Sequence, residues 1–146
     1  MRYLLPFFLT IVLSCAQPTP TTTTNQLPNV LLILADDMGF SDLGCYGSQI
    51  ETPNLDRLAK EGVRFSNFYN CAKCTPSRGS LLTGRYPHRV GVGSAIAMPD
   101  KNYKKGAYQG YLEPSIPNMA NFFSKNGYQT GMSGKWHLGE REQHWP

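Results

Sequence analysis

Residues 74–85 constrain the fold of this chain more than any other stretch, because a thiol and two arginines bracket a short predicted helix. The sequence there is Cys-Thr-Pro-Ser-Arg-Gly-Ser-Leu-Leu-Thr-Gly-Arg. Pro76 fixes its own φ and pushes Thr75 towards an extended shape, and a glycine near the end of the run is typical of a helix stop. The pattern predicts a helix over 76–83 with Cys74 at its N-terminus, where partial positive charge favours an anionic nucleophile or a bound anion.

The other predicted elements alternate between strands and helices. The continuous apolar run Val30–Ala35 is typical of a strand buried on both faces of a parallel sheet. Further strands are predicted over 63–69 and 128–132, and further helices over 53–61 and 115–126. This alternation predicts an α/β fold, a layered arrangement with a mostly parallel sheet flanked by helices.

A pair of carboxylates follows the first predicted strand. Asp36 and Asp37 stand at its carboxyl end, where open parallel sheets bind their ligands. Neighbouring strand residues point to opposite faces, so both side chains reach one ion only if the chain bends there. A divalent cation would relieve their repulsion, and oxygen ligands suit calcium or magnesium. The alternative is that the pair caps a turn.

Three basic side chains are candidates for handling an anion beside Cys74. Arg78 lies one helical turn after the cysteine and can reach back over the same spot. Lys135 and His137 are two residues apart, which on an extended segment puts both on one face and Trp136 on the other. The lysine can neutralise an anionic oxygen and the histidine can accept a proton. The predicted catalytic residues are therefore Cys74, Arg78, Lys135 and His137.

Taken together, these motifs resemble the type I sulfatases of the alkaline-phosphatase-like superfamily. The resemblance includes the signature C-x-P-S-R-x-x-x-L-T-G-R, the strand and aspartates of Asn29–Asp37, and Gly134–Gly139, in family order over roughly 28–146. It implies that a maturation enzyme oxidises Cys74 to formylglycine, whose hydrate attacks the sulfur of a sulfate ester. It also implies calcium, with magnesium as the alternative, bound by Asp36, Asp37 and the residue derived from Cys74.

Other interpretations of the same residues stay open. The superfamily includes phosphodiesterases and phosphonate hydrolases, and an inactive lipid-anchored remnant that binds carbohydrate is a third function. Cys71 and Cys74 also form a C-x-x-C pair, which is typical of redox or zinc sites. A zinc site would need a second ligand pair at close spacing, and a redox site leaves the rest of the signature unexplained. Whether Cys45 and Cys71 pair is open.

The N-terminal residues predict export. A cationic start precedes the apolar run Leu4–Leu13, which is too short to span a bilayer and typical of a signal peptide. Leu13-Ser14-Cys15 resembles a lipobox, and cleavage after Ala16 is the alternative. We expect a signal peptide over 1–15, a Thr/Pro-rich linker over 16–27 and the catalytic part over 28–146. The expected location is the periplasm or cell surface, with a lipid anchor at Cys15.

Composition and length limit the partners. The formal net charge is +4 and no dense Lys/Arg block occurs, so nucleic acid is not an expected partner. The expected substrate is a sulfated small molecule or polysaccharide. Members of the family are usually several times longer than the 146 residues of this sequence. The resemblance therefore implies that these residues form the N-terminal part of the catalytic domain. Further metal ligands would then follow Pro146, and the fragment alone is expected to be inactive.

Overall fold

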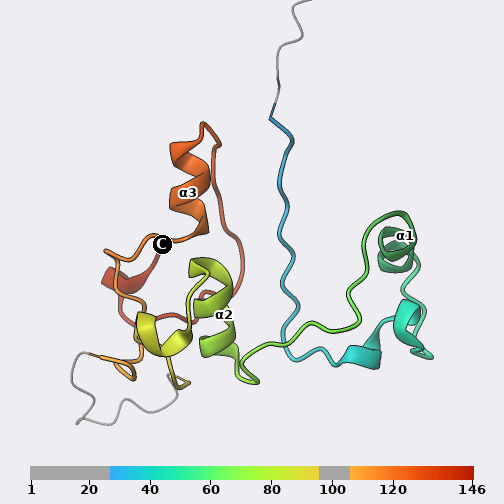
Figure 1. Ribbon diagram of the computed structural model, residues 1–146, viewed down its shortest axis with the longest axis horizontal. Helices are drawn as coiled ribbons and strands as arrows, with labels where there is room; N and C mark the ends of the chain where they lie inside the picture. The colour runs from blue at the N-terminus through green and yellow to red at the C-terminus, as the bar shows by residue number, and fades with distance from the viewer. Residues whose placement is uncertain (1–26, 96–105) are drawn as a thin grey trace, which may run out of the picture. The chain divides into compact units, whose positions relative to one another are not determined.

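The structure is a computed structural model that describes residues 27–95 and 106–146 (Figure 1). In the described part of the chain, the boundary between two units falls between Ile33 and Leu34. In the first unit, residues 27–33 carry no helix or strand. The predicted signal peptide, the anchor at Cys15 and nearly all of the linker lie outside the described residues. Within the described ranges, no helix has the length and apolar character needed to cross a bilayer.

Helices are the regular structure of the second unit. Its α-helices are α1 (Pro53–Glu61), α2 (Cys74–Thr83) and α3 (Met119–Lys125). Its 3₁₀ helices are η1 (Phe40–Asp42), η2 (Gly44–Tyr46), η3 (Pro87–Val90) and η4 (Glu142–His144). Helix α1 contacts η2, whereas α2 contacts both η3 and α3. These contacts define two separate neighbourhoods, one around α1 and one around α2.

Helix α1 has the predicted bounds and is fixed by local polar groups. Pro53 is its first residue, a position where no backbone N–H is needed, and the N–H of Gly62 bonds to the Leu58 carbonyl at 2.9 Å. The Asp56 carboxylate accepts hydrogen bonds from the Cys45 N–H at 2.7 Å and from the Thr52 hydroxyl at 2.9 Å. The prediction for 53–61 is confirmed.

Helix α2 ends as predicted but begins two residues earlier, at Cys74. The prediction of an extended Thr75 is wrong, because this residue lies in the first helical turn and is fully buried. The Ser77 N–H bonds to the Lys73 carbonyl at 3.0 Å, which closes the turn around the proline. Pro76 is tolerated because the first N–H groups of a helix have no partner within the helix. Burial of Thr75 therefore outweighs the pre-proline preference.

Helix α3 is shorter than the predicted span of 115–126. It begins at Met119 because Asn118 and Asn121 cap each other: the Asn118 side chain accepts from the Asn121 N–H at 3.2 Å, and the Asn121 side chain accepts from the Asn118 N–H at 2.9 Å. Pro117 disfavours helical geometry in the residue before it. The helix stop at Gly127 is confirmed by its φ of 84°.

The three segments predicted as strands carry no β-structure in the described part of the chain. Residues 30–35, 63–69 and 128–132 are irregular, and their apolar side chains other than the half-buried Tyr128 are exposed, with Leu31 at 83% and Val63 at 84%. A strand of a parallel sheet is stable only beside hydrogen-bonded neighbours. Ladder partners for these segments are not among the described residues. The mostly parallel sheet stays a prediction.

The buried core lies beneath α2. Val90, Val92, Leu112 and Leu138 are buried and pack together. A Cβ built on Gly79 would lie 2.3 Å from Val92 Cγ2, so only glycine allows α2 to lie this close to the residue 90–92 segment. The Leu112 N–H bonds to the Leu138 carbonyl at 2.9 Å. This core supports α2 and the segment that contains Lys135 and His137.

Candidate active site

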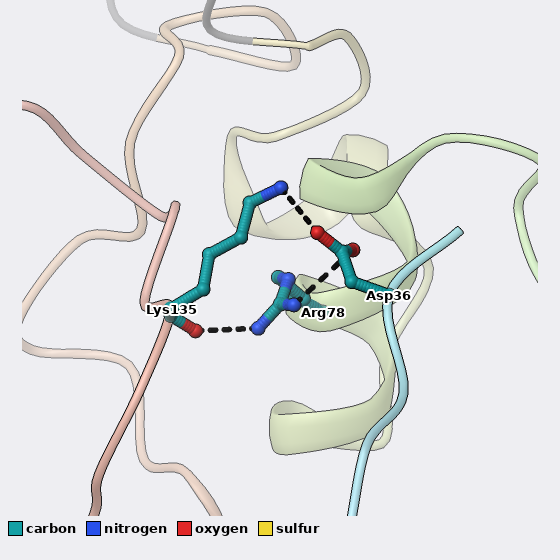
Figure 2. Close-up of polar contacts among 3 residues, drawn as sticks. All are labelled: Asp36, Arg78 and Lys135. Carbon is teal, nitrogen blue, oxygen red and sulfur yellow. Dashed lines mark hydrogen bonds and ion pairs between the residues drawn. The ribbon is translucent and has the colours of Figure 1, made fainter. Parts of the chain in front are cut away.

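Three charged residues that are far apart in the sequence meet beside α2 (Figure 2). The Asp36 carboxylate faces the Lys135 ammonium at 2.6 Å and the Arg78 guanidinium at 3.3 Å. Arg78 also donates from Nη1 to the Lys135 backbone carbonyl at 2.5 Å. We call these three residues the Asp36 cluster. The structure thus brings together the first aspartate of the predicted metal pair and two of the predicted catalytic residues.

The fold fixes Arg78 more firmly than its two partners. Arg78 lies in the second turn of α2 and its side chain is 8% exposed, compared with 37% for Asp36 and 43% for Lys135. Its position follows from the close approach of α2 to the core at Gly79, the next residue. Because its guanidinium contacts both a carboxylate and a carbonyl, Arg78 joins the residues after the first predicted strand to the Lys135 segment.

Within the Asp36 cluster, Asp36 and Lys135 shift each other's pKa. The hydrogen bond from Lys135 is the main reason that the pKa of Asp36 is lowered, with burial opposing it and Arg78 adding to it. The hydrogen bond to Asp36 raises the pKa of Lys135, and the charge of Cys74 acts in the same direction. Asp36 and Lys135 are both ionised at neutral pH.

His137 has an unusual backbone and a partly buried ring. Its φ is 55°, in the left-handed region that side chains other than glycine rarely adopt. Its Nδ1 is buried and has no hydrogen-bond partner among the described residues. Burial is the main cause that lowers its pKa, followed by the positive charges of Lys135 and Arg78. The imidazole is therefore neutral at neutral pH and is able to accept a proton.

The backbone turns at Asp37, where φ is 54°, and the bend needed for two adjacent carboxylates to approach one ion therefore lies at this residue. Asp37 makes no hydrogen bond or ion pair with any other described residue. The carboxylates of Asp36 and Asp37 match a hard cation in kind, since calcium binds six to eight oxygens. Over residues 27–95 and 106–146, no group of three or more His, Cys, Asp or Glu residues is placed to hold a metal. The pair would supply only part of such a site.

Sequence reasoning assigned no role to His144, which the structure places beside the Lys135 segment. Its backbone carbonyl accepts a hydrogen bond from the Trp136 indole at 2.7 Å, and its ring stacks on Tyr111 with centroids 4.1 Å apart. Trp136 lies 8 residues before His144, but the residues between Trp136 and η4 form no helix or strand in which that spacing would place the two together. The nearest signal is Gly139, where a Cβ would lie 2.3 Å from the His144 Cβ, and a lone glycine does not identify its neighbour.

The family model and the similar proteins of known name all point to sulfatases. The family model described as "Sulfatase" matches residues 28–144. The chain is 45% identical over 130 residues to steryl-sulfatase of Mus musculus, covering 88% of this chain and 20% of that protein. It is 47% identical over 114 residues to arylsulfatase A of Homo sapiens, covering 77% of this chain and 21% of that protein.

A solved structure is also similar. The crystal structure of Ps i-CgsB in complex with k-i-k-neocarrahexaose aligns with a TM-score of 0.70 and 40% identity. The alignment covers 83% of this chain and 26% of that one. The chain thus spans about a fifth of the length of the two curated relatives above, at 20% and 21%.

Proposed function

The chain belongs to the sulfatase family, which confirms the resemblance seen in its motifs, and we propose that the protein hydrolyses sulfate esters at the Asp36 cluster. The observation that carries this proposal is the joining of Asp36, Arg78 and Lys135 beside the start of α2, where Cys74 is the first residue. A family signature alone would not require these residues to meet.

The described side chains supply distinct functions for a sulfate ester. Arg78 and Lys135 carry the positive charge that offsets the negative charge developing on the transferred group. Asp36 holds both cations in place through its two oxygens. His137, kept neutral by burial, accepts a proton at a ring nitrogen. The N-terminus of α2 adds partial positive charge next to Cys74.

Two groups implied by the family would complete this chemistry. Formylglycine, made from Cys74 by a maturation enzyme, would supply a hydrated aldehyde as the nucleophile, and calcium or magnesium would supply Lewis acidity. Asp36 and Asp37 would hold the metal in part, together with the residue derived from Cys74. The position of Cys74 as the first residue of α2, the helix that also carries Arg78, supports its role as the reacting residue.

We propose a sulfated polysaccharide as the natural substrate. The support is the similarity to Ps i-CgsB, which was crystallised with the oligosaccharide k-i-k-neocarrahexaose. We also propose that the protein is exported and anchored through lipidated Cys15, on the basis of the apolar run before that residue. The test of the anchor is Cys15→Ala, which should move the protein from the membrane fraction to the soluble fraction.

Activity is tested on the full-length gene product, made in a host that converts sulfatase cysteines. Aryl sulfate turnover should fall to background in Cys74→Ala and stay at the wild-type level in Cys45→Ala, since Cys45 is held in the α1 neighbourhood. Peptide mass spectrometry should find an aldehyde at residue 74 of the wild type. Near-normal turnover by Cys74→Ala would overturn the proposal, as would faster cleavage of phosphate diesters than of sulfate esters.

A further inference from the structure

The segment from Lys135 to Leu138 has two sides. Lys135 contributes to the Asp36 cluster, and the pKa of His137 responds to the charges of that cluster. Leu138 is fully buried in the core, and Trp136 packs against the same core. Trp136 therefore packs against the core as expected, whereas the φ of 55° at His137 departs from the extended segment that would put Lys135 and His137 on one face. What holds Trp136 also decides where the two candidate catalytic side chains point.

The backbone at His137 must be held by its neighbours. A non-glycine residue with a φ of 55° persists only where the surrounding structure fixes it. Each neighbour is bonded to a different part of the chain. The Lys135 carbonyl accepts from Arg78, the Trp136 indole donates to the His144 carbonyl, and the Leu138 carbonyl accepts from Leu112. Two of these contacts use residues outside the sulfatase motifs, Leu112 and His144, and only the one to His144 is made by a side chain of the segment, the Trp136 indole.

His144 is well placed to hold Trp136. It is 9% exposed, and its ring lies parallel to Tyr111, with a 2° angle between the planes. Tyr111 precedes Leu112, whose N–H bonds to Leu138, so the stack and this bond join the same two segments. The Nδ1 of His144 is buried without a partner in the described part of the chain. The ring therefore contributes its flat apolar face rather than a hydrogen bond through Nδ1.

We propose that Tyr111 and His144 form a positioning pair that fixes Trp136 and thereby holds the adjoining backbone so that Lys135 reaches Asp36. The pair touches none of the reacting groups and acts through the Trp136 indole. The role of the pair in turnover rests on the proposed sulfatase function. Its role in fixing Trp136 does not, and the two are measured separately.

Turnover is measured on the full-length gene product, per active site counted from its aldehyde content. His144→Ala removes the ring and should lower kcat about tenfold, with a smaller change in KM, because small displacements of catalytic groups cost rate. His144→Phe keeps a flat ring and should restore kcat to within about threefold of wild type, since the Nδ1 makes no bond. Trp145→Phe, a change at the exposed neighbouring residue, is the control.

The contact is measured on the full-length gene product by the indole N–H resonance of Trp136, which is identified by its absence from the spectrum of a Trp136→Phe variant. That resonance should move in His144→Ala and remain near its original position in His144→Phe. An unmoved resonance, or a wild-type kcat in His144→Ala, would overturn the positioning role. A His144→Phe variant as slow as His144→Ala would also overturn it. Absence of sulfate ester turnover in the wild type would defeat the proposed function instead, while the resonance would still report on the pair.

Discussion

Helices α1 and α2 are of similar length but depend on different parts of the chain. Helix α1 contains no buried residue, and its carboxylate Asp56 is bonded to groups 11 and 4 residues away. Helix α2 contains four buried residues: Thr75, Pro76, Arg78 and Gly79. Its Arg78 contacts residues 42 and 57 positions away. Helix α1 is thus specified by its own surroundings, and α2 by segments that only the folded chain brings near.

This contrast separates stability from function. A change in α1 should weaken a local network and leave sulfate ester turnover per folded molecule unaltered. A change in α2 should disturb the core, the Asp36 cluster, or both. Each matched pair of variants below places one change in or near α2 and its control elsewhere, except where α1 itself is tested.

The largest effect is expected at Arg78. Arg78→Ala leaves Asp36 with one cation and the Lys135 carbonyl without a donor, so turnover should fall about 100- to 1,000-fold. Arg78→Lys keeps the positive charge but not the forked guanidinium geometry, so its turnover should lie between those of Arg78→Ala and the wild type. The control is Arg57→Ala on the exposed surface of α1. Steady-state kinetics with an aryl sulfate measure turnover in all three variants. Turnover of Arg78→Ala within threefold of that of Arg57→Ala would contradict the special role of α2.

The second effect concerns the packing of α2 on the core. Alanine favours helices over glycine by about 1 kcal/mol, yet Gly79→Ala would place its Cβ 2.3 Å from Val92 Cγ2. Overpacking should dominate, with a net loss of about 1–3 kcal/mol in the free energy of unfolding. Denaturant titration followed by circular dichroism measures it. Gly131→Ala, where no atom lies within 4 Å, is the control and should be near neutral. A Gly79→Ala protein as stable as wild type would show that the core residues around Val92 shift to accommodate the added methyl group.

A smaller effect is expected in the α1 neighbourhood. Asp56→Ala removes the acceptor for the Cys45 N–H and the Thr52 hydroxyl, which should cost about 1 kcal/mol of unfolding free energy. Asp56→Asn keeps one oxygen acceptor and should cost less. Turnover per folded molecule should not change in either variant. A tenfold loss of turnover in Asp56→Ala, measured on the folded fraction, would mean that α1 is coupled to the site.

Local sequence signals predicted where the helices end but not where two of them begin. Helix α2 begins earlier than predicted and helix α3 begins later. Gly62, Gly84 and Gly127 ended their helices as expected, because glycine stops act within a few residues. Helix α2 begins early because its first turn is buried, and burial depends on residues that are distant in sequence. Helix α3 begins late because the Asn118–Asn121 cap competes with continuation.

The candidate site was predictable only where a motif carried it. The structure brings Asp36, Arg78 and Lys135 together, and their catalytic and metal-binding roles stay predictions. The bond from Arg78 to the Lys135 carbonyl had no signal in sequence, since any residue carries a carbonyl. His144 was missed for the same reason, because its bond to Trp136 is made through the backbone. The predicted sheet depends on strand neighbours, which local patterns do not identify.

The smallest expected effect is a shift in the pKa of His137, without a loss of folding. The pKa of His137 lies below its ordinary value of 6.5, first because of burial and then because of the charges of Lys135 and Arg78. An imidazole with a lowered pKa contributes stability above about pH 6.5, and this contribution is lost as pH falls through the folded pKa, since the unfolded chain binds the proton more readily. Lys135→Met removes one of the charges and should raise the pKa of His137.

Proton NMR of the His137 ring measures this shift as a function of pH. Lys125→Met, at the exposed end of α3, is the matched control, because it changes the net charge equally without touching the Asp36 cluster. Burial remains in the Lys135→Met protein, so the pKa should move towards its ordinary value without reaching it. Equal shifts in the two variants would show that His137 responds to overall charge. A larger shift in Lys135→Met would instead show that the charges of the Asp36 cluster, which α2 helps to hold in place, act on the proton affinity of the candidate base locally.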